Sequence, residues 1–190
     1  MLRVARIIPK TSAEGPFERC AIWVAGCDLA CPGCCNPELF DPASGTPTAL
    51  DAVLDTAMDA GVEGLTMLGG EPLQQPKALA ALLEGAQARG LGTIVFSGYT
   101  LQRAQSLPGF SKIWAHLDTL VDGPFDVHRI EPSRRFIGSS NQQLHHRTER
   151  YAKASLWRGP ARIEVRVDAD GTVELHGMPR PVSRLARALK

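Results

Sequence analysis

The sequence has no long hydrophobic run and almost no net charge. No apolar stretch approaches the length of a membrane-spanning helix, and the first six residues lack the apolar region of a signal peptide. The formal charge of +1 gives no electrostatic reason to expect binding to nucleic acid or to a membrane surface. We therefore expect a cytoplasmic protein with neither kind of partner.

Aromatic residues are also few, at 6% of the chain, whereas 44% of residues are hydrophobic and 22% are charged. This composition is ordinary for a globular protein and permits a sizeable core. A chain of 190 residues is most simply one domain with a short appendage. We expect a core over residues 1–150 and an appendage over residues 151–190.

Cysteine is scarce, but four of the five cysteines lie close together. Cys27, Cys31 and Cys34 have the spacing C-x3-C-x2-C and follow an apolar run that ends at Gly26. In an apparently cytosolic chain, clustered cysteines favour metal binding over disulfides. Three thiolates on one short loop can bind one 4Fe–4S cluster, and one of its four irons then has no protein ligand.

Other interpretations of the cysteines remain open. A structural zinc ion usually needs four ligands in two separated pairs, and redox or disulfide chemistry is a third possibility. Cys35 could be a fourth ligand, but adjacent residues on a turn rarely both reach one tetrahedral ion. Cys20 opens an apolar strand, where a free cysteine behaves as a small hydrophobe. We expect both of these cysteines to be bystanders.

Apolar patterns typical of strands and of helices alternate three times, which favours a parallel α/β sheet with right-handed crossovers. An edge strand is expected over residues 2–8, and the helix after the cysteines is expected to begin with Thr48 as its N-cap. Another helix is expected to begin at Pro76, because proline suits a first helical turn. The buried strands are expected at residues 20–25, 64–68, 92–96 and 117–121.

Residues that could bind a ligand or take part in a reaction come directly after these strands. They are the loop that carries Cys27, Cys31 and Cys34, and the segments Gly69-Gly70-Glu71, Ser97-Gly98-Tyr99 and Asp122-Gly123. In a parallel sheet, whether a barrel or doubly wound, such segments converge on one face. The pattern alone does not separate these two architectures.

The end of the chain has a different pattern. Residues 161–167 and 172–176 alternate around a turn that contains Gly171, which indicates a β-hairpin. The last ten residues are expected to form a short basic helix. No clear strand or helix pattern is present between Phe125 and Trp157.

The cysteine spacing, taken together with Gly69-Gly70-Glu71-Pro72, resembles the radical S-adenosylmethionine (SAM) superfamily. Residues 97–100, 120–125 and 138–142 resemble segments of the small activating enzymes of anaerobic ribonucleotide reductase. The likeness covers roughly residues 14–142 and does not include the hairpin. Cys35 is a departure, since those enzymes commonly carry tyrosine there.

The resemblance implies a partial open (β/α)6-type barrel, with the hairpin as a small C-terminal appendage. It implies two cofactors, a 4Fe–4S cluster on Cys27, Cys31 and Cys34, and SAM on the fourth iron. No catalytic side chain beyond these is implied. The implied SAM contacts are Gly69 and Gly70 to the amino group, with Glu71 supporting their loop, Ser97 to the carboxylate or ribose, Asp122 to the ribose, and Ser140 and Asn141 from the other side.

The implied activity is the reductive cleavage of SAM to methionine and a 5′-deoxyadenosyl radical. The electron would come from a low-potential donor of the flavodoxin or ferredoxin type. The substrate would be a backbone glycine of a large glycyl-radical enzyme. One alternative is a radical SAM enzyme that modifies a peptide or small molecule, with the hairpin recognising it. Another is a non-catalytic iron–sulfur electron-transfer module or zinc-binding module.

Overall fold

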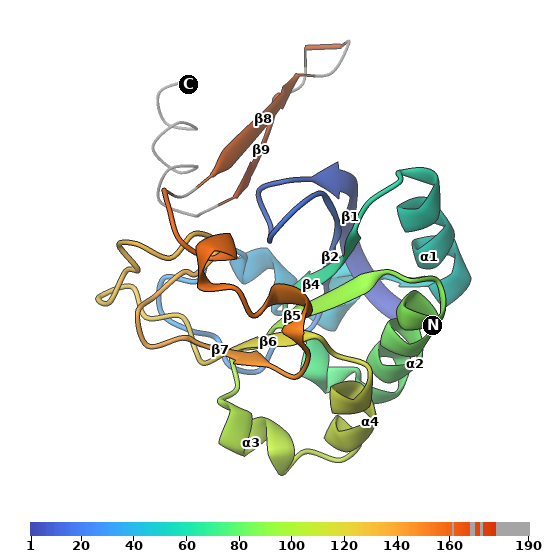
Figure 1. Cartoon of the computed structure of the whole chain (residues 1–190), viewed down its shortest axis with the longest axis horizontal. Coiled ribbons are helices and arrows are strands. Elements are labelled where there is room, and N and C mark those ends of the chain that lie inside the picture. The colour runs from blue at the N-terminus through green and yellow to red at the C-terminus, as the bar shows by residue number, and fades with distance from the viewer. Residues whose placement is uncertain (161, 168–169, 172, 178–190) are drawn as a thin grey trace.

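The computed structural model of the chain describes residues 1–160, 162–167, 170–171 and 173–177 (Figure 1). Its largest part is a seven-stranded sheet with the strand order β3-β1-β2-β4-β5-β6-β7, and β8 and β9 form a separate two-stranded sheet. The strands of the large sheet are β1 (Leu2–Thr11), β2 (Arg19–Val24), β3 (Thr46–Thr48), β4 (Gly64–Gly69), β5 (Gly92–Phe96), β6 (Thr119–Asp122) and β7 (Gln143–His146).

The centre of the large sheet is parallel, as the alternation of patterns predicts. β2, β4, β5 and β6 pair in parallel, whereas β1, β3 and β7 join the sheet antiparallel, so the whole sheet is mixed. The expected strand at residues 92–96 coincides with β5, and the other three expected buried strands differ by one or two residues at one or both ends. The helices are α1 (Leu50–Asp59), α2 (Pro76–Ala88), α3 (Leu101–Gln105) and α4 (Phe110–Ala115).

The expectation of an edge strand over residues 2–8 is wrong. β1 lies between β2 and β3, because its first residues pair with all three residues of β3. β3 is too short to give a sequence pattern, and its Pro47 suits an edge strand, where a missing N–H is tolerated. Thr48 belongs to this pairing, so the N-cap of α1 is Ala49 instead of Thr48.

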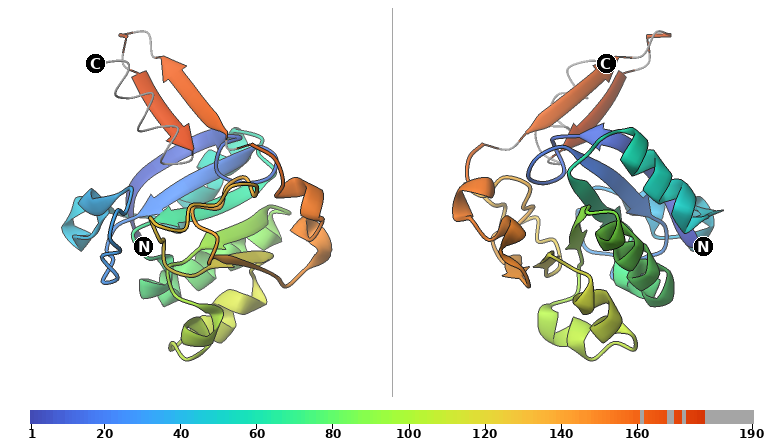
Figure 2. Two further views of the ribbon diagram at one scale, coloured as in Figure 1. Left: turned by 90° about the vertical axis from the view of Figure 1, so that its left-hand side faces the viewer. Right: turned by 45° about the vertical axis from the view of Figure 1, so that its right-hand side comes forward.

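The two faces of the large sheet are covered differently (Figure 2). Helices α1, α2 and α4 cover one face, where the largest cluster of buried apolar side chains lies. The irregular chain after β6 covers part of the other face, and its Phe136, Tyr151 and Trp157 pack with Ile94 and Val121 of the sheet. Among the described helices, none is both long and apolar enough to cross a membrane.

β7 lies in the stretch where the sequence shows no strand pattern. Its four residues pair antiparallel with β6, from Gln143 opposite Asp122 to His146 opposite Thr119. Strand propensity is weak in this polar segment, and the available edge of β6 decides its conformation.

The expected C-terminal hairpin is present as β8 (Ile163–Val167) and β9 (Val173–Gly177). It projects from the body of the molecule near the start of β2 (Figure 2). Its polar face contacts the body, because Glu164 accepts a hydrogen bond from the hydroxyl of Thr11. The expected basic helix over the last ten residues lies outside the described residues.

The boundary near residue 150 stays a prediction. Tyr151 and Trp157 come after this position, yet both are buried with the side chains of β5 and β6. The packing of the main body therefore continues to residue 157.

Candidate functional site

A cavity of about 640 Å³ lies at the carboxyl ends of the parallel strands. The segments that directly follow β2, β4, β5 and β6 all contribute to its lining. This is the convergence that a parallel sheet predicts. The predicted site residues that line the cavity are Cys27, Cys31, Cys34, Gly69, Gly70, Glu71 and Ser97.

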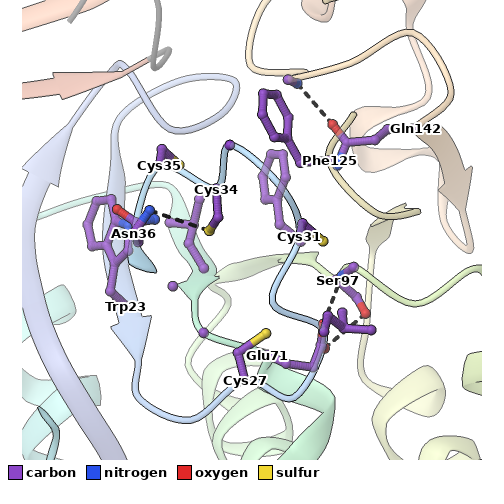
Figure 3. A pocket seen from close by; sticks show the side chains of 18 of the residues that line it. Trp23, Cys27, Cys31, Cys34, Cys35, Asn36, Glu71, Ser97, Phe125 and Gln142 are labelled. Carbon is purple, nitrogen blue, oxygen red and sulfur yellow. Dashed lines mark hydrogen bonds between the residues drawn. The ribbon is translucent and has the colours of Figure 1, made fainter. Parts of the chain in front are cut away.

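The three cysteines lie on the loop after β2, which we call the cysteine loop (residues 26–36; Figure 3). Gly26 ends the strand with φ at +98°, a left-handed conformation that favours glycine. The backbone N–H of Gly26 donates to the carbonyl of Leu39 (2.9 Å), and that of Cys27 donates to the carbonyl of Phe40 (3.1 Å). The start of the loop is thereby fixed to the chain that leaves it.

The second half of the cysteine loop is a tight turn. The N–H of Cys34 donates to the carbonyl of Cys31 (3.0 Å), with Gly33 at φ +75° between them. The N–H of Asn36 donates to Sγ of Cys34 at 3.5 Å, a contact drawn in Figure 3. The turn keeps these two cysteines on one wall of the cavity.

The thiols differ in acidity because their surroundings differ. Burial raises the pKa of Cys27 and of Cys31 above 9.0, whereas a hydrogen bond from the side chain of Cys35 lowers the pKa of Cys34 to about 6. A thiol must lose its proton to bind metal. Metal uptake at this loop is therefore coupled to proton release, chiefly from the first two cysteines.

A single metal ion and an iron–sulfur cluster place different demands on the positions of the three thiols. Within the described residues, no three His, Cys, Asp or Glu side chains lie close enough together to hold a single metal ion. A 4Fe–4S cluster requires less convergence of the thiols than a single ion does, because each thiolate would bind a different iron.

The loop after β4 packs directly on the start of the cysteine loop. The N–H of Gly70 donates to the carbonyl of Val24, and the N–H of Glu71 donates to the carbonyl of Gly26, each at 2.8 Å. A Cβ on Gly70 would lie 2.3 Å from the carbonyl oxygen of Gly26. Glycine is therefore required here by the close approach of two backbone segments.

Glu71 is a buried carboxyl that joins two of the cavity loops. It accepts hydrogen bonds from the N–H of Leu73 (2.9 Å), the N–H of Gly98 (2.8 Å) and the hydroxyl of Ser97 (2.9 Å). Burial raises the pKa of Glu71 to about 7, although these three donors lower it. Its side chain serves as a scaffold between the loops after β4 and β5.

The three remaining predicted residues are not among those that line the cavity. Asp122 is the last residue of β6, and Ser140 and Asn141 lie in the chain between β6 and β7, where Gly138 and Gln142 line the cavity. Asp122 accepts from the N–H groups of Leu101 (2.5 Å) and Gln143 (3.2 Å), so its carboxylate ties α3 to β7. Asn141 donates to the carbonyl of Pro124 (2.7 Å), and Ser140 is exposed. Their contacts with SAM stay predictions.

Several lining residues are not evident from the sequence. Gln142 donates to the carbonyl of Gly123 and accepts from the N–H of Gly138, both at 3.0 Å, and so joins two segments of the wall. Glu14 and His176 also line the cavity, although they come from the β1–β2 loop and from β9. The only sequence signal for Gln142 was its place in the 138–142 segment.

Known proteins match most of the chain. The model of a family described as a 4Fe-4S single cluster domain matches residues 13–145. The anaerobic ribonucleoside-triphosphate reductase-activating protein of Pasteurella multocida (strain Pm70) is 31% identical over 151 residues, which cover 74% of this chain and 95% of the relative. The chain belongs to this activating-protein family.

Other members of the activating-protein family are similar to the same extent. The proteins of that name from Escherichia coli (strain K12) and Vibrio cholerae serotype O1 are each 30% identical, over 148 and 147 residues. These matches cover 73% and 72% of this chain, and 94% and 93% of the relatives. The match to the 4Fe-4S domain ends before β8, so the hairpin lies outside it.

Proposed function

We propose that this chain is a radical SAM enzyme of the activating type. The observation that carries the proposal is that Cys27, Cys31 and Cys34 share one cavity with the Gly69-Gly70-Glu71 loop and Ser97. The 4Fe-4S domain match supports the cluster, and the names of the relatives support an activating role. SAM and its cleavage are our inference from the motifs.

The cysteines would hold the cluster, and SAM would occupy the remaining cavity. A reduced cluster held there would supply the electron for cleavage of SAM to methionine and a 5′-deoxyadenosyl radical. The chain's own residues orient the ligands and keep water out. Glu71 holds the loops after β4 and β5 in one arrangement, so that the carbonyls of Gly69 and Gly70 can accept from the amino group of SAM.

The other predicted contacts to SAM extend this arrangement. The Ser97 hydroxyl lies at the carboxyl end of β5 and lines the cavity, where it would bind the carboxylate or ribose. Asp122 would act from the end of β6, and Ser140 and Asn141 from the chain between β6 and β7. Since Asp122 already accepts two backbone hydrogen bonds, its contact with the ribose would use its remaining lone pairs.

The mixed sheet is consistent with a partial open barrel of the (β/α)6 type. In this proposal residues 1–150 form the radical SAM core and residues 151–190 the appendage. The enzyme would work in the cytoplasm, where thiols stay reduced, and all five of its cysteines are free. A flavodoxin or ferredoxin would deliver the electron.

The substrate we propose is a backbone glycine of a large glycyl-radical enzyme of the anaerobic ribonucleotide reductase kind. The relatives' names carry this assignment. A second candidate, modification of a peptide or small molecule, is favoured by one observation. His176 and Gly177 of β9 line the cavity, although the hairpin lies outside the 4Fe-4S domain match.

The test is production of 5′-deoxyadenosine by anaerobically reconstituted protein with SAM and a strong reductant, with Cys31→Ala as control. The proposal expects product from the wild type and none from the variant. Stimulation by a glycyl-radical enzyme would favour the first substrate, and stimulation by a peptide or metabolite the second.

Two results would contradict the proposal. A fully loaded 4Fe–4S protein that neither binds nor cleaves SAM would be an electron-transfer module. Purified protein with one zinc ion and no sulfide would be a zinc-binding module.

A further inference from the structure

The cysteine loop contributes no fully buried residue between its first cysteine and Cys35. Ala30, between the first two cysteines, has φ at +42°, a conformation that is strained for a residue with a Cβ. Strain of this kind persists only where the surroundings impose it. The contacts near Ala30 therefore determine the position of this arm of the loop.

Asp28, the residue after the first cysteine, makes the polar contacts that join this arm to two other loops. Its Oδ1 accepts a hydrogen bond from the hydroxyl of Tyr99 (2.8 Å) and another from the side-chain amide of Gln74. The Gln74 amide also donates to the Tyr99 hydroxyl (3.0 Å). The three side chains come from the loops after β2, β4 and β5, so they join the cysteine loop to both neighbouring loops.

Tyr99 is itself fixed on all sides. The residue is 9% exposed, its N–H donates to the hydroxyl of Ser97 (3.1 Å), and its carbonyl accepts from the N–H of Gly123 (3.0 Å). Beside it, Leu29 lies so close to Gly98 that a Cβ there would be 2.4 Å from Leu29 Cδ1. A rigid segment after β5 thus contacts two consecutive residues of the loop.

We propose that Tyr99 is a positioning residue, which acts through Asp28 to hold the Cys27–Cys31 arm where the cluster is bound. The proposal deepens the proposed function and rests on it only for the presence of the cluster. Tyr99 does not touch the cluster in this role. Its hydroxyl fixes the loop, and the loop fixes the two thiols.

The chain offers a matched control for loss of a tyrosine hydroxyl. Tyr151 is also buried, and its hydroxyl accepts a hydrogen bond from Arg19 (2.8 Å) at the amino ends of the strands, away from the cysteines. Tyr99→Phe and Tyr151→Phe each delete one oxygen from a buried ring. Only the first deletion removes a contact to the cysteine loop.

The first measurement uses the full chain without cofactors, by NMR relaxation of the backbone amides. In Tyr99→Phe we expect the order parameters of residues 28–31 to fall from about 0.85 toward about 0.6, the range of a flexible segment. Asp28→Ala should give the same fall, and the double variant no further fall, because both act through one contact. Tyr151→Phe should leave these residues unchanged.

The second measurement uses the cluster-loaded protein. The electron paramagnetic resonance spectrum of the reduced cluster should change in Tyr99→Phe and stay as in the wild type in Tyr151→Phe. A general loss of stability would not alter the spectrum of a loaded cluster.

Unchanged order parameters of residues 28–31 in Tyr99→Phe would overturn the proposal. An equal fall of these order parameters in Tyr151→Phe would also overturn it, and so would an unchanged paramagnetic resonance spectrum in Tyr99→Phe. Additive effects of Tyr99→Phe and Asp28→Ala would also overturn it, because the two residues would then act separately. Failure of the chain to take up a 4Fe–4S cluster would instead contradict the proposed function. The order parameters of the cofactor-free chain would still decide whether Tyr99 holds the loop.

Discussion

At the scale of single residues, the cavity depends on glycines and carboxyls whose environments are unusual. Gly70 has no room for a Cβ, and Glu71 is fully buried with all its hydrogen bonds inside the protein. The family resemblance implied a SAM contact for Gly70 and a supporting role in the loop for Glu71. Their packing shows that they also join the strand ends to one another.

Gly70→Ala should be strongly destabilising. Its Cβ would lie 2.3 Å from the carbonyl oxygen of Gly26, and this neighbour is backbone, which cannot rotate away. We expect a loss of more than about 2 kcal/mol in the free energy of unfolding, measured by urea denaturation. Gly61→Ala is the control, because open space surrounds Gly61 and only its φ of +60° is unfavourable, at about 1 kcal/mol. Equal losses would show that the loops can separate.

Glu14→Gln should change how stability depends on pH. Burial raises the pKa of Glu14 from 4.5 to about 7, and the negative charge of Glu164 adds to the rise. A hydrogen bond from the N–H of Gly177 and the positive charge of Arg6 lower this pKa, but by less. Between these pH values the folded chain keeps a proton that the unfolded chain loses, so stability falls as pH rises. Below pH 4.5 this contribution is constant.

The measurement is the unfolding free energy of the cofactor-free chain across pH 4.5–7. The glutamine of Glu14→Gln has no titratable proton, so the fall in unfolding free energy over this range should be smaller by up to about 3 kcal/mol. Glu18→Gln, at an exposed position, should keep the wild-type slope. If Glu14→Gln also keeps that slope, Glu14 is ionised in the folded chain.

At the scale of elements, the amino ends of β2, β4 and β5 are joined by one buried arginine. Arg19 is 0% exposed and donates to Thr66 (2.6 Å), the carbonyl of Gly92 (3.2 Å) and Glu63 (2.7 Å). Arg19→Met should cost about 3–5 kcal/mol, because buried acceptors lose their donor. Arg89→Met, which removes an exposed ion pair with Asp51, should cost less than about 1 kcal/mol. Similar losses from the two changes in chemical denaturation would contradict this account.

The sequence predicts the central elements well because each carries its own signal. β4 ends in two glycines, α2 begins at a proline, and β5 is a short apolar run between a glycine and a polar turn. β3 and β7 carry no such signal, since each is a strand only by pairing with a neighbour distant in sequence. Local pattern does not contain that information.

The same limit applies to the site. The three cysteines and the Gly69-Gly70-Glu71 segment are motifs of fixed spacing and are evident in the sequence. The contact between Asp28 and Tyr99 spans 71 positions, and nothing local to either residue indicates it. The hairpin shows a further limit. Alternation indicates its two strands but does not say what their faces contact, and Val165 and Val167 are exposed.

At the scale of the whole molecule, the cysteines stand apart from what holds the fold together. Cys27, Cys31 and Cys34 lie outside all three clusters of buried apolar side chains in the described chain. Replacing all three by serine should therefore change the unfolding free energy of the cofactor-free chain by less than about 1 kcal/mol. Replacing buried Cys20 by serine should cost more, since it places a hydroxyl in an apolar strand. A triple variant that fails to fold would contradict this separation.

The separation has a consequence for how the protein matures in the cell. The three cysteines that we propose as ligands come from one loop outside the apolar clusters, so we expect the sheet to fold before the cluster is bound. In small zinc domains, by contrast, the metal is needed for folding itself. A chain built in this way can wait, already folded, for delivery of its cluster.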